Sequence, residues 1–155
     1  MAELRSFRSM AWRMLALMGL LALGVLAGCE PLGPIPGKSV DGVLAAAPDD
    51  WRALDSAEVV QLETAGNYSV NIWGVGTVDC YFVAASRGPK TRWAKRIGKD
   101  PSVRLRVGNS VYALTASEVS DRAVLERVAA AYNKKYDFDA DDDFPDAVIY
   151  RLDRL

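Results

Sequence analysis

The residues best suited to binding chemistry are the cations of residues 81–107, YFVAASRGPKTRWAKRIGKDPSVRLRV. The pattern predicts a strand, a basic loop, a short helix and a second strand. Loop amides, a helix N-terminus and guanidinium groups together suit a phosphate or a carboxylate, although a solvated basic face is the alternative. The stretch contains one acid, Asp100, and eight of the chain's 19 lysines and arginines: Arg87, Lys90, Arg92, Lys95, Arg96, Lys99, Arg104 and Arg106.

Composition excludes several kinds of chemistry. The 155 residues include no histidine, which excludes Ser-His and Cys-His catalysis and every zinc site with histidine ligands. The chain is 50 % hydrophobic and 25 % charged, as expected for one globular domain with an extension. Without residues 1–28 it has 16 basic and 19 acidic residues. This balance argues against nucleic-acid binding, which requires a basic excess.

The N-terminus has the pattern of a secretory signal. Three arginines precede an uncharged apolar run at residues 14–27, and the run ends in LAGC at residues 26–29. These four residues resemble the bacterial lipobox, which implies cleavage before Cys29 and a lipid on its thiol. The apolar run is short for a membrane span. An ordinary signal peptide or an uncleaved anchor is the alternative, and Met10 is a second candidate start.

The sequence therefore predicts three parts. These are a lipoprotein signal peptide over residues 1–28, a lipidated Cys29 with a Pro/Gly tether and a short helical lead-in over residues 29–56, and a folded domain over residues 57–155. Lipid at Cys29 predicts anchoring in the cell envelope, at the periplasmic face of the inner or outer membrane in a Gram-negative bacterium. Cys80 lies in an apolar run, which favours a buried thiol over a reactive one.

The spacing of apolar residues predicts short strands from residue 57 onward. Gly66-Asn67 suits a hairpin turn between strands at 59–64 and 68–75. A bend at residues 74–76 leads to a third strand at 78–85. The remaining predicted elements are a helix at 91–97, strands at 103–107 and 111–119 joined by Gly108-Asn109, a helix capped by Ser120, and a strand at 147–152.

Residues 39–54, ahead of these strands, are predicted to be loosely helical, with a turn capped by Asp49. Trp51, Trp73 and Tyr81 are expected to be core or sheet-face aromatics. The order β-β-β-α-β-β-α-β, with about six strands, predicts a mainly β (α+β) antiparallel barrel with short flanking helices.

Several segments of this domain resemble the split β-barrel flavin-binding superfamily. ETAG at residues 63–66, Trp73 and YFV at residues 81–83 resemble the opening hairpin of those proteins. The resemblance covers residues 57–152. The deazaflavin-dependent nitroreductase-like branch, with the related pyridoxamine-phosphate-oxidase-like barrels, is similar at SRG 86–88, RW 92–93, DPSVRL 100–105, VAAAY 128–132, KY 135–136 and residues 148–152.

The resemblance implies an FMN or deazaflavin mononucleotide bound at a barrel groove, with its phosphate facing the three cations Arg87, Lys90 and Arg92. In the family the cofactor performs the hydride chemistry and the protein orients it, so a chain without histidine remains compatible. Such barrels often dimerise with the cofactor at the interface, which makes a homodimer an expectation. The implied cofactor-binding positions are Ser86, Arg87, Gly88, Lys90, Arg92 and Trp93.

The first hairpin departs from the family pattern. Family members usually carry a basic, glycine-rich segment there, whereas GNYSVN at residues 66–71 contains no cation. Two functions are therefore weighed. In the first, the domain is a binding or envelope-associated module without catalysis, and no cofactor is certain. In the second, it is an FMN- or deazaflavin-dependent oxidoreductase. The expected partners are the membrane, through Cys29, and a phosphate-bearing small ligand.

Residues 137–146, DFDADDDFPD, are predicted to be a solvated acidic loop. Asp139, Asp141 and Asp143 are spaced like the start of a calcium loop, but the turn glycine is missing and the twelfth position is Tyr150. The sequence therefore predicts no metal site.

Overall fold

The computed structural model describes residues 37–137 and 146–155. The predicted signal peptide, Cys29 and most of the tether lie outside the described residues, as does most of the acidic run. The described residues all belong to one compact unit. Its described helices are all too short or too polar to cross a membrane.

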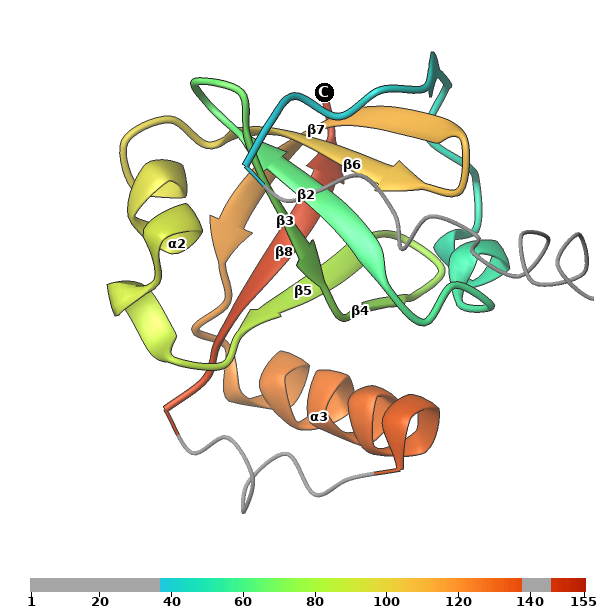
Figure 1. Ribbon diagram of the computed structural model, residues 1–155. Coiled ribbons are helices and arrows are strands. Elements are labelled where there is room, and N and C mark those ends of the chain that lie inside the picture. The colour runs from blue at the N-terminus through green and yellow to red at the C-terminus, as the bar shows by residue number, and fades with distance from the viewer. Residues whose placement is uncertain (1–36, 138–145) are drawn as a thin grey trace, which may run out of the picture. The chain divides into compact units, whose positions relative to one another are not determined.

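One mainly antiparallel sheet forms the fold (Figure 1). Hydrogen bonds link its strands in the order β3-β2-β6-β7-β8-β5-β4, and β1 pairs with β7 in parallel. The strands are β1 Val43–Leu44, β2 Val60–Thr64, β3 Tyr68–Ile72, β4 Gly74–Gly76, β5 Tyr81–Ala85, β6 Ser102–Val107, β7 Ser110–Glu118 and β8 Val148–Arg154. The helices are α2 Arg92–Ile97 and α3 Arg122–Tyr136, with 3-10 turns η1 Trp51–Leu54 and η2 Gly88–Lys90.

The two ends of the strand order are two halves of one chain segment. β3 pairs with β2 and β4 pairs with β5, and Trp73 alone separates β3 from β4. This segment joins the two ends of the sheet and so closes it into a barrel. β3 and β5 are not paired with each other, and the barrel is split between them. The predicted mainly β split barrel with short helices is confirmed. The described ranges contain eight strands instead of about six, because the strand expected at 68–75 breaks in two and β1 is added.

Local sequence explains the hairpins and the face each strand presents. Gly66 and Asn67 both have positive φ, 77° and 56°, as the tight turn between β2 and β3 requires. In β6, Val103 and Leu105 are buried in the core, as their alternation with Arg104 predicts.

Trp51 fills the barrel interior from η1. It is fully buried, and its ring centroid lies 6.1 Å from that of Tyr81 and 5.5 Å from that of Tyr112. The expected packing of Trp51 and Tyr81 in the core is therefore confirmed. The carboxylate of Asp50 accepts a 3.0 Å hydrogen bond from the Arg52 N–H and caps the turn, so the predicted Asp49 cap is one residue off.

The helix predicted across residues 39–54 is wrong apart from this turn. Val43 and Leu44 form β1 instead, opposite Ser110 and Val111 of β7. β8 pairs with β7 only from Leu114 onward, so the first residues of β7 offer an open edge that the sequence of residues 39–54 does not reveal.

A buried carboxylate fixes the start of the described chain on the sheet. Glu63 of β2 accepts a 2.7 Å hydrogen bond from the Val40 N–H and lies 3.2 Å from the guanidinium of Arg104 on β6. The Ser39 hydroxyl also donates to it, at 3.2 Å. Gly37 then donates its N–H to the Ser69 carbonyl of β3 at 2.8 Å.

Each of the two α-helices packs on the barrel through one apolar face. α2 buries Trp93, Ala94 and Ile97. α3 buries Val128 and Tyr132 in a second cluster with Val75, Phe82 and Cys80, whose thiol is free and buried as expected. The cap of α3 is Asp121, which accepts from the Val124 N–H at 3.1 Å, and not the predicted Ser120.

Candidate functional site

At the split of the barrel, three side chains of α3 form hydrogen bonds with the backbone between β3 and β4. The Tyr132 hydroxyl donates to the Trp73 carbonyl at 3.1 Å, and Lys135 Nζ donates to the Gly74 carbonyl at 2.7 Å. The Tyr136 hydroxyl accepts from the Gly74 N–H at 3.0 Å, and its ring stacks on Trp73 with 4.7 Å between centroids. These contacts satisfy the backbone where β3 turns into β4, so the chain can leave the ladder there without burying unpaired groups.

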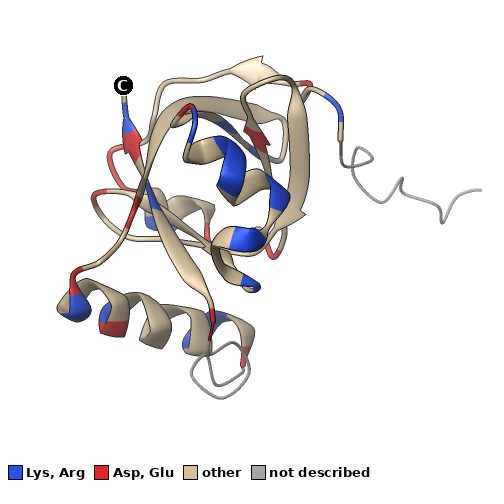
Figure 2. Ribbon diagram, turned by 90° about the vertical axis from the view of Figure 1, so that its left-hand side faces the viewer, with Lys and Arg blue, Asp and Glu red and all other residues tan. Residues whose placement is uncertain are grey.

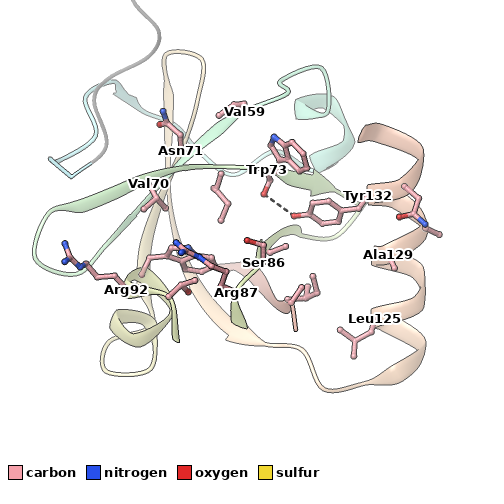
Figure 3. Close-up of a pocket in the computed structure, with 18 of the residues that line it drawn as sticks. Val59, Val70, Asn71, Trp73, Ser86, Arg87, Arg92, Leu125, Ala129 and Tyr132 are labelled. Carbon is pink, nitrogen blue, oxygen red and sulfur yellow. Dashed lines mark hydrogen bonds between the residues drawn. The ribbon is translucent and has the colours of Figure 1, made fainter. Parts of the chain in front are cut away.

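A groove of about 1060 Å³ lies at this split (Figure 3). β3 supplies one wall through Val70 and Ile72, and α3 supplies the facing wall through Leu125 and Ala129. Trp73, which is 42 % exposed, lies near the α3 end of β3. The sequence predicts a core or a sheet-face position for Trp73, and this exposure excludes only the core position. Apolar walls with a few polar groups are typical of small-molecule sites.

Two arginines give the groove its charge. Arg87 follows β5 and Arg92 begins α2, and both line the groove. Neither forms an ion pair with a described residue, although the Arg92 guanidinium lies 5.6 Å from the ring centroid of Tyr68. Glu126 also lines the groove, but Arg122 pairs with it at 2.9 Å. The positive charge of Arg87 and Arg92 is thus uncompensated by the described lining.

The residues predicted to hold a cofactor separate into two groups. Ser86 and Trp93 line the groove beside Arg87 and Arg92, and Trp93 anchors α2 by packing edge-on against Tyr150 at 5.3 Å. Gly88 and Lys90 are not among the lining residues. Gly88 is buried with φ of 63°, and a Cβ there would lie 2.8 Å from the Asp146 carbonyl oxygen. Its place is therefore set by close backbone packing.

The eight clustered cations do not surround one anion-binding site, so the interpretation that they act together on one anion is wrong. Arg96 donates to the Ala65 carbonyl at 2.7 Å, and its guanidinium lies 4.8 Å from the Tyr68 ring centroid. Arg104 pairs with Glu63, and Arg106 donates to the Gln61 side chain at 3.0 Å. Lys90, Lys95 and Lys99 are exposed and do not line the groove. Figure 2 shows several Lys and Arg positions along α2 and its flanking turns.

Burial favours the protonated form of Tyr132, one of the two tyrosines in the described lining of the groove. Burial raises the pKa of the Tyr132 phenol well above its ordinary value, so it stays protonated at neutral pH. Loss of solvation lowers the pKa of the Lys135 ammonium, while Asp55 at 3.6 Å opposes that shift. These groups fix the backbone of the split, and the arginines and the apolar walls are left to hold a ligand.

Sequence reasoning missed the wall that α3 contributes. Leu125 and Tyr132 are spaced as parts of one apolar stripe on α3, and such a stripe does not by itself indicate a groove wall. The one local signal was Trp73 directly before Gly74-Val75-Gly76, an aromatic residue at a break in a strand pattern.

Solved structures show the same fold. The chain superposes on a candidate pyridoxamine 5'-phosphate oxidase from Listeria innocua with a TM-score of 0.52 and 16 % identity, over 64 % of this chain and 85 % of that one. The superposition on HutZ, the heme storage protein from Vibrio cholerae, has a TM-score of 0.54 and 17 % identity, over 66 % of this chain and 86 % of that one. The superposition on an F420-H2 dependent reductase, FDR-A, has a TM-score of 0.54 and 16 % identity, over 74 % of this chain and 100 % of that one. At these identities the likeness shows the split-barrel fold.

Sequence comparison places the chain in a family. A search of the curated proteins found no match. Residues 53–148, which contain most of the barrel and both groove arginines, match the family described as "Uncharacterized protein conserved in bacteria (DUF2255)". The match covers more than half of the 155 residues, and the chain belongs to the DUF2255 family.

Proposed function

We propose that this chain is a lipid-anchored envelope protein whose groove binds an anionic, ring-bearing small molecule of the flavin or deazaflavin class. The observation that carries the binding proposal is the pair Arg87 and Arg92, uncompensated at one end of an apolar groove. Two guanidinium groups suit a phosphate because each presents forked N–H donors. The anchoring proposal rests on LAGC at residues 26–29.

The lining residues fit such a cofactor. In the proposed complex, Arg87 and Arg92 bind the phosphate and the Ser86 hydroxyl donates a further hydrogen bond. The apolar side chains of β3 and α3 cover the ring system and exclude water from it. A bound flavin or deazaflavin supplies hydride-transfer chemistry. The residues of the chain bind and orient it.

Binding without catalysis is the favoured function. The turn at Gly66-Asn67 carries no cation, and the nearest guanidinium, that of Arg96, donates to the Ala65 carbonyl. Cofactor contacts from that hairpin, which the family resemblance implies, are therefore missing. An oxidoreductase is the second candidate, because the retained Arg87–Arg92 pair is the part of the site that a catalytic flavin also needs.

A comparison of FMN with riboflavin tests the binding proposal, because the two ligands share one ring system and differ in the phosphate. Flavin fluorescence is followed while each is titrated with the purified protein. We expect FMN to bind at least about tenfold more tightly, since a charge-assisted contact to each guanidinium is lost with riboflavin. The advantage should shrink at high salt.

Equal affinity for both ligands, or no uptake of FMN or a deazaflavin at high micromolar concentration, would contradict the proposal. Turnover of a bound flavin with a nicotinamide or deazaflavin reductant would favour the oxidoreductase over the binding module.

A further inference from the structure

The eight clustered cations divide by residue type as well as by contact. The arginines line the groove or bind other parts of the barrel, as described above. The lysines do neither: Lys90, Lys95 and Lys99 are exposed, lie outside the groove lining and form no ion pair with a described residue. Lysine, a hydrated point charge on a flexible stem, suits a diffuse anionic surface better than a fixed forked contact. We call these three residues the lysine face.

The lysine face lies on the outward side of η2 and α2. Lys95 lies in α2 and Lys99 two residues after its end, and both are exposed, whereas Trp93 and Ile97 of the helix are buried. Their stretch contains no acid before Asp100. The charge of this side is therefore positive over its whole length.

The described chain begins near the β2–β3 turn, which α2 also contacts. Gly37 is hydrogen-bonded to Ser69 of β3, and the Glu63–Arg104 pair holds the residues that follow it. The neighbouring Tyr68 lies under the guanidinium of Arg96, which comes from α2. The chain's entry point and α2 thus adjoin the same β2–β3 turn, as Figure 1 also shows.

From these positions we infer that the lysine face docks on the anionic phospholipid headgroups of the bilayer that carries the Cys29 lipid. This inference rests on the proposed anchoring. Seven residues, 30–36, separate Cys29 from Gly37, which makes eight Cα–Cα steps, so the anchor can be at most about 29 Å from Gly37. A tether of that length keeps the lysine face close to the bilayer. Basic clusters next to a membrane anchor are attracted to anionic lipid within a Debye length of the surface.

Hydrogen–deuterium exchange on the full-length protein tests this docking. The protein is produced with its own signal, mass spectrometry checks for lipid on Cys29, and the protein is reconstituted in vesicles. One set contains phosphatidylcholine alone and the other also contains phosphatidylglycerol. We expect peptides covering Lys90–Lys99 to exchange about threefold more slowly on the anionic vesicles, and the difference to vanish at high salt.

Matched variants separate the lysine face from general charge. K95Q/K99Q should lose most of the protection, whereas R127Q/K134Q, which removes two exposed cations of α3, should keep it. Lipidated protein that exchanges equally on both vesicles would overturn the docking alone. Protection that appears only in native membranes would point to an acidic protein partner and would also overturn it. An unmodified Cys29 would refute the anchoring, and the docking would fail with it.

Discussion

Replacing Arg87 and Arg92 together by glutamine is expected to weaken FMN binding by about a hundredfold or more, because each hydrogen bond to a charged group contributes about 1.5–3 kcal/mol. Both guanidinium groups line the groove, and no described acid neutralises them. Glutamine keeps part of the aliphatic stem and a polar end, but it removes the guanidinium that lies 5.6 Å from the Tyr68 ring centroid. The measurement is the dissociation constant from a flavin fluorescence titration.

Riboflavin provides the internal control for this double variant. Its affinity should stay within about twofold of the wild-type value, since it lacks the phosphate. The variant K95Q/K99Q removes two positive charges from the same helix region outside the groove. It should leave FMN affinity within about threefold, the change expected for exposed, screened charges. A similar loss in both double variants would show that general charge, and not the groove pair, attracts the ligand.

Gly76→Ala is expected to destabilise the fold by about 3 kcal/mol or more, the upper range for inserting atoms into a packed interior. A Cβ at Gly76 would lie 2.1 Å from the carbonyl oxygen of Trp51, and no side-chain rotation can relieve a clash with backbone. The substitution would push η1 away from β4 and disturb the packing of Trp51 in the core. It would also strain the 2.7 Å hydrogen bond from the Gly76 N–H to Asp55.

Gly98→Ala is the matched control, because it makes the same chemical change where space is available. Gly98 follows α2 with helical φ and ψ, and the nearest atom to a Cβ there is 3.7 Å away. Alanine at such a position should be neutral or stabilise by about 0.4–1 kcal/mol. Urea denaturation of both variants gives the free energies of unfolding. Equal midpoints for Gly76→Ala and the wild type would show that η1 does not pack on β4 as described.

The parts of the fold that sequence predicts are those set by local chemistry. Gly66-Asn67 forms its turn because both residues tolerate positive φ, and β6 alternates because one face is buried. The break at Trp73 was not predicted, since its backbone groups are satisfied by Tyr132 and Tyr136 from about 60 residues later in the chain. Residues 43–44 were predicted as helix for a similar reason. They form the strand β1 because they pair with an open edge of β7, which the sequence around them does not reveal.

In the candidate site, too, the sequence predicts the residues that lie close together in the chain and misses those brought in from far away. Arg87 and Arg92 are close in sequence and reach the groove together, so a local cluster of cations indicated them. The same cluster also indicated Lys90 and Arg104, which do not line the groove, and Arg104 pairs with Glu63 instead. The wall formed by Leu125 and Ala129 depends on how α3 crosses the split, and no local pattern reports that crossing.

The most direct test of the groove as a ligand site is a nitrogen–proton NMR titration of the labelled protein with FMN. Binding in the groove predicts that the Trp73 indole signal, the side-chain signals of Arg87 and Arg92 and the amides of β3 shift together along one saturation curve. Signals of Val111 and its neighbours in β7, which do not line the groove, should stay in place. Shifts confined to β7 or to the lysine face, with Trp73 and Arg92 unmoved, would contradict the account.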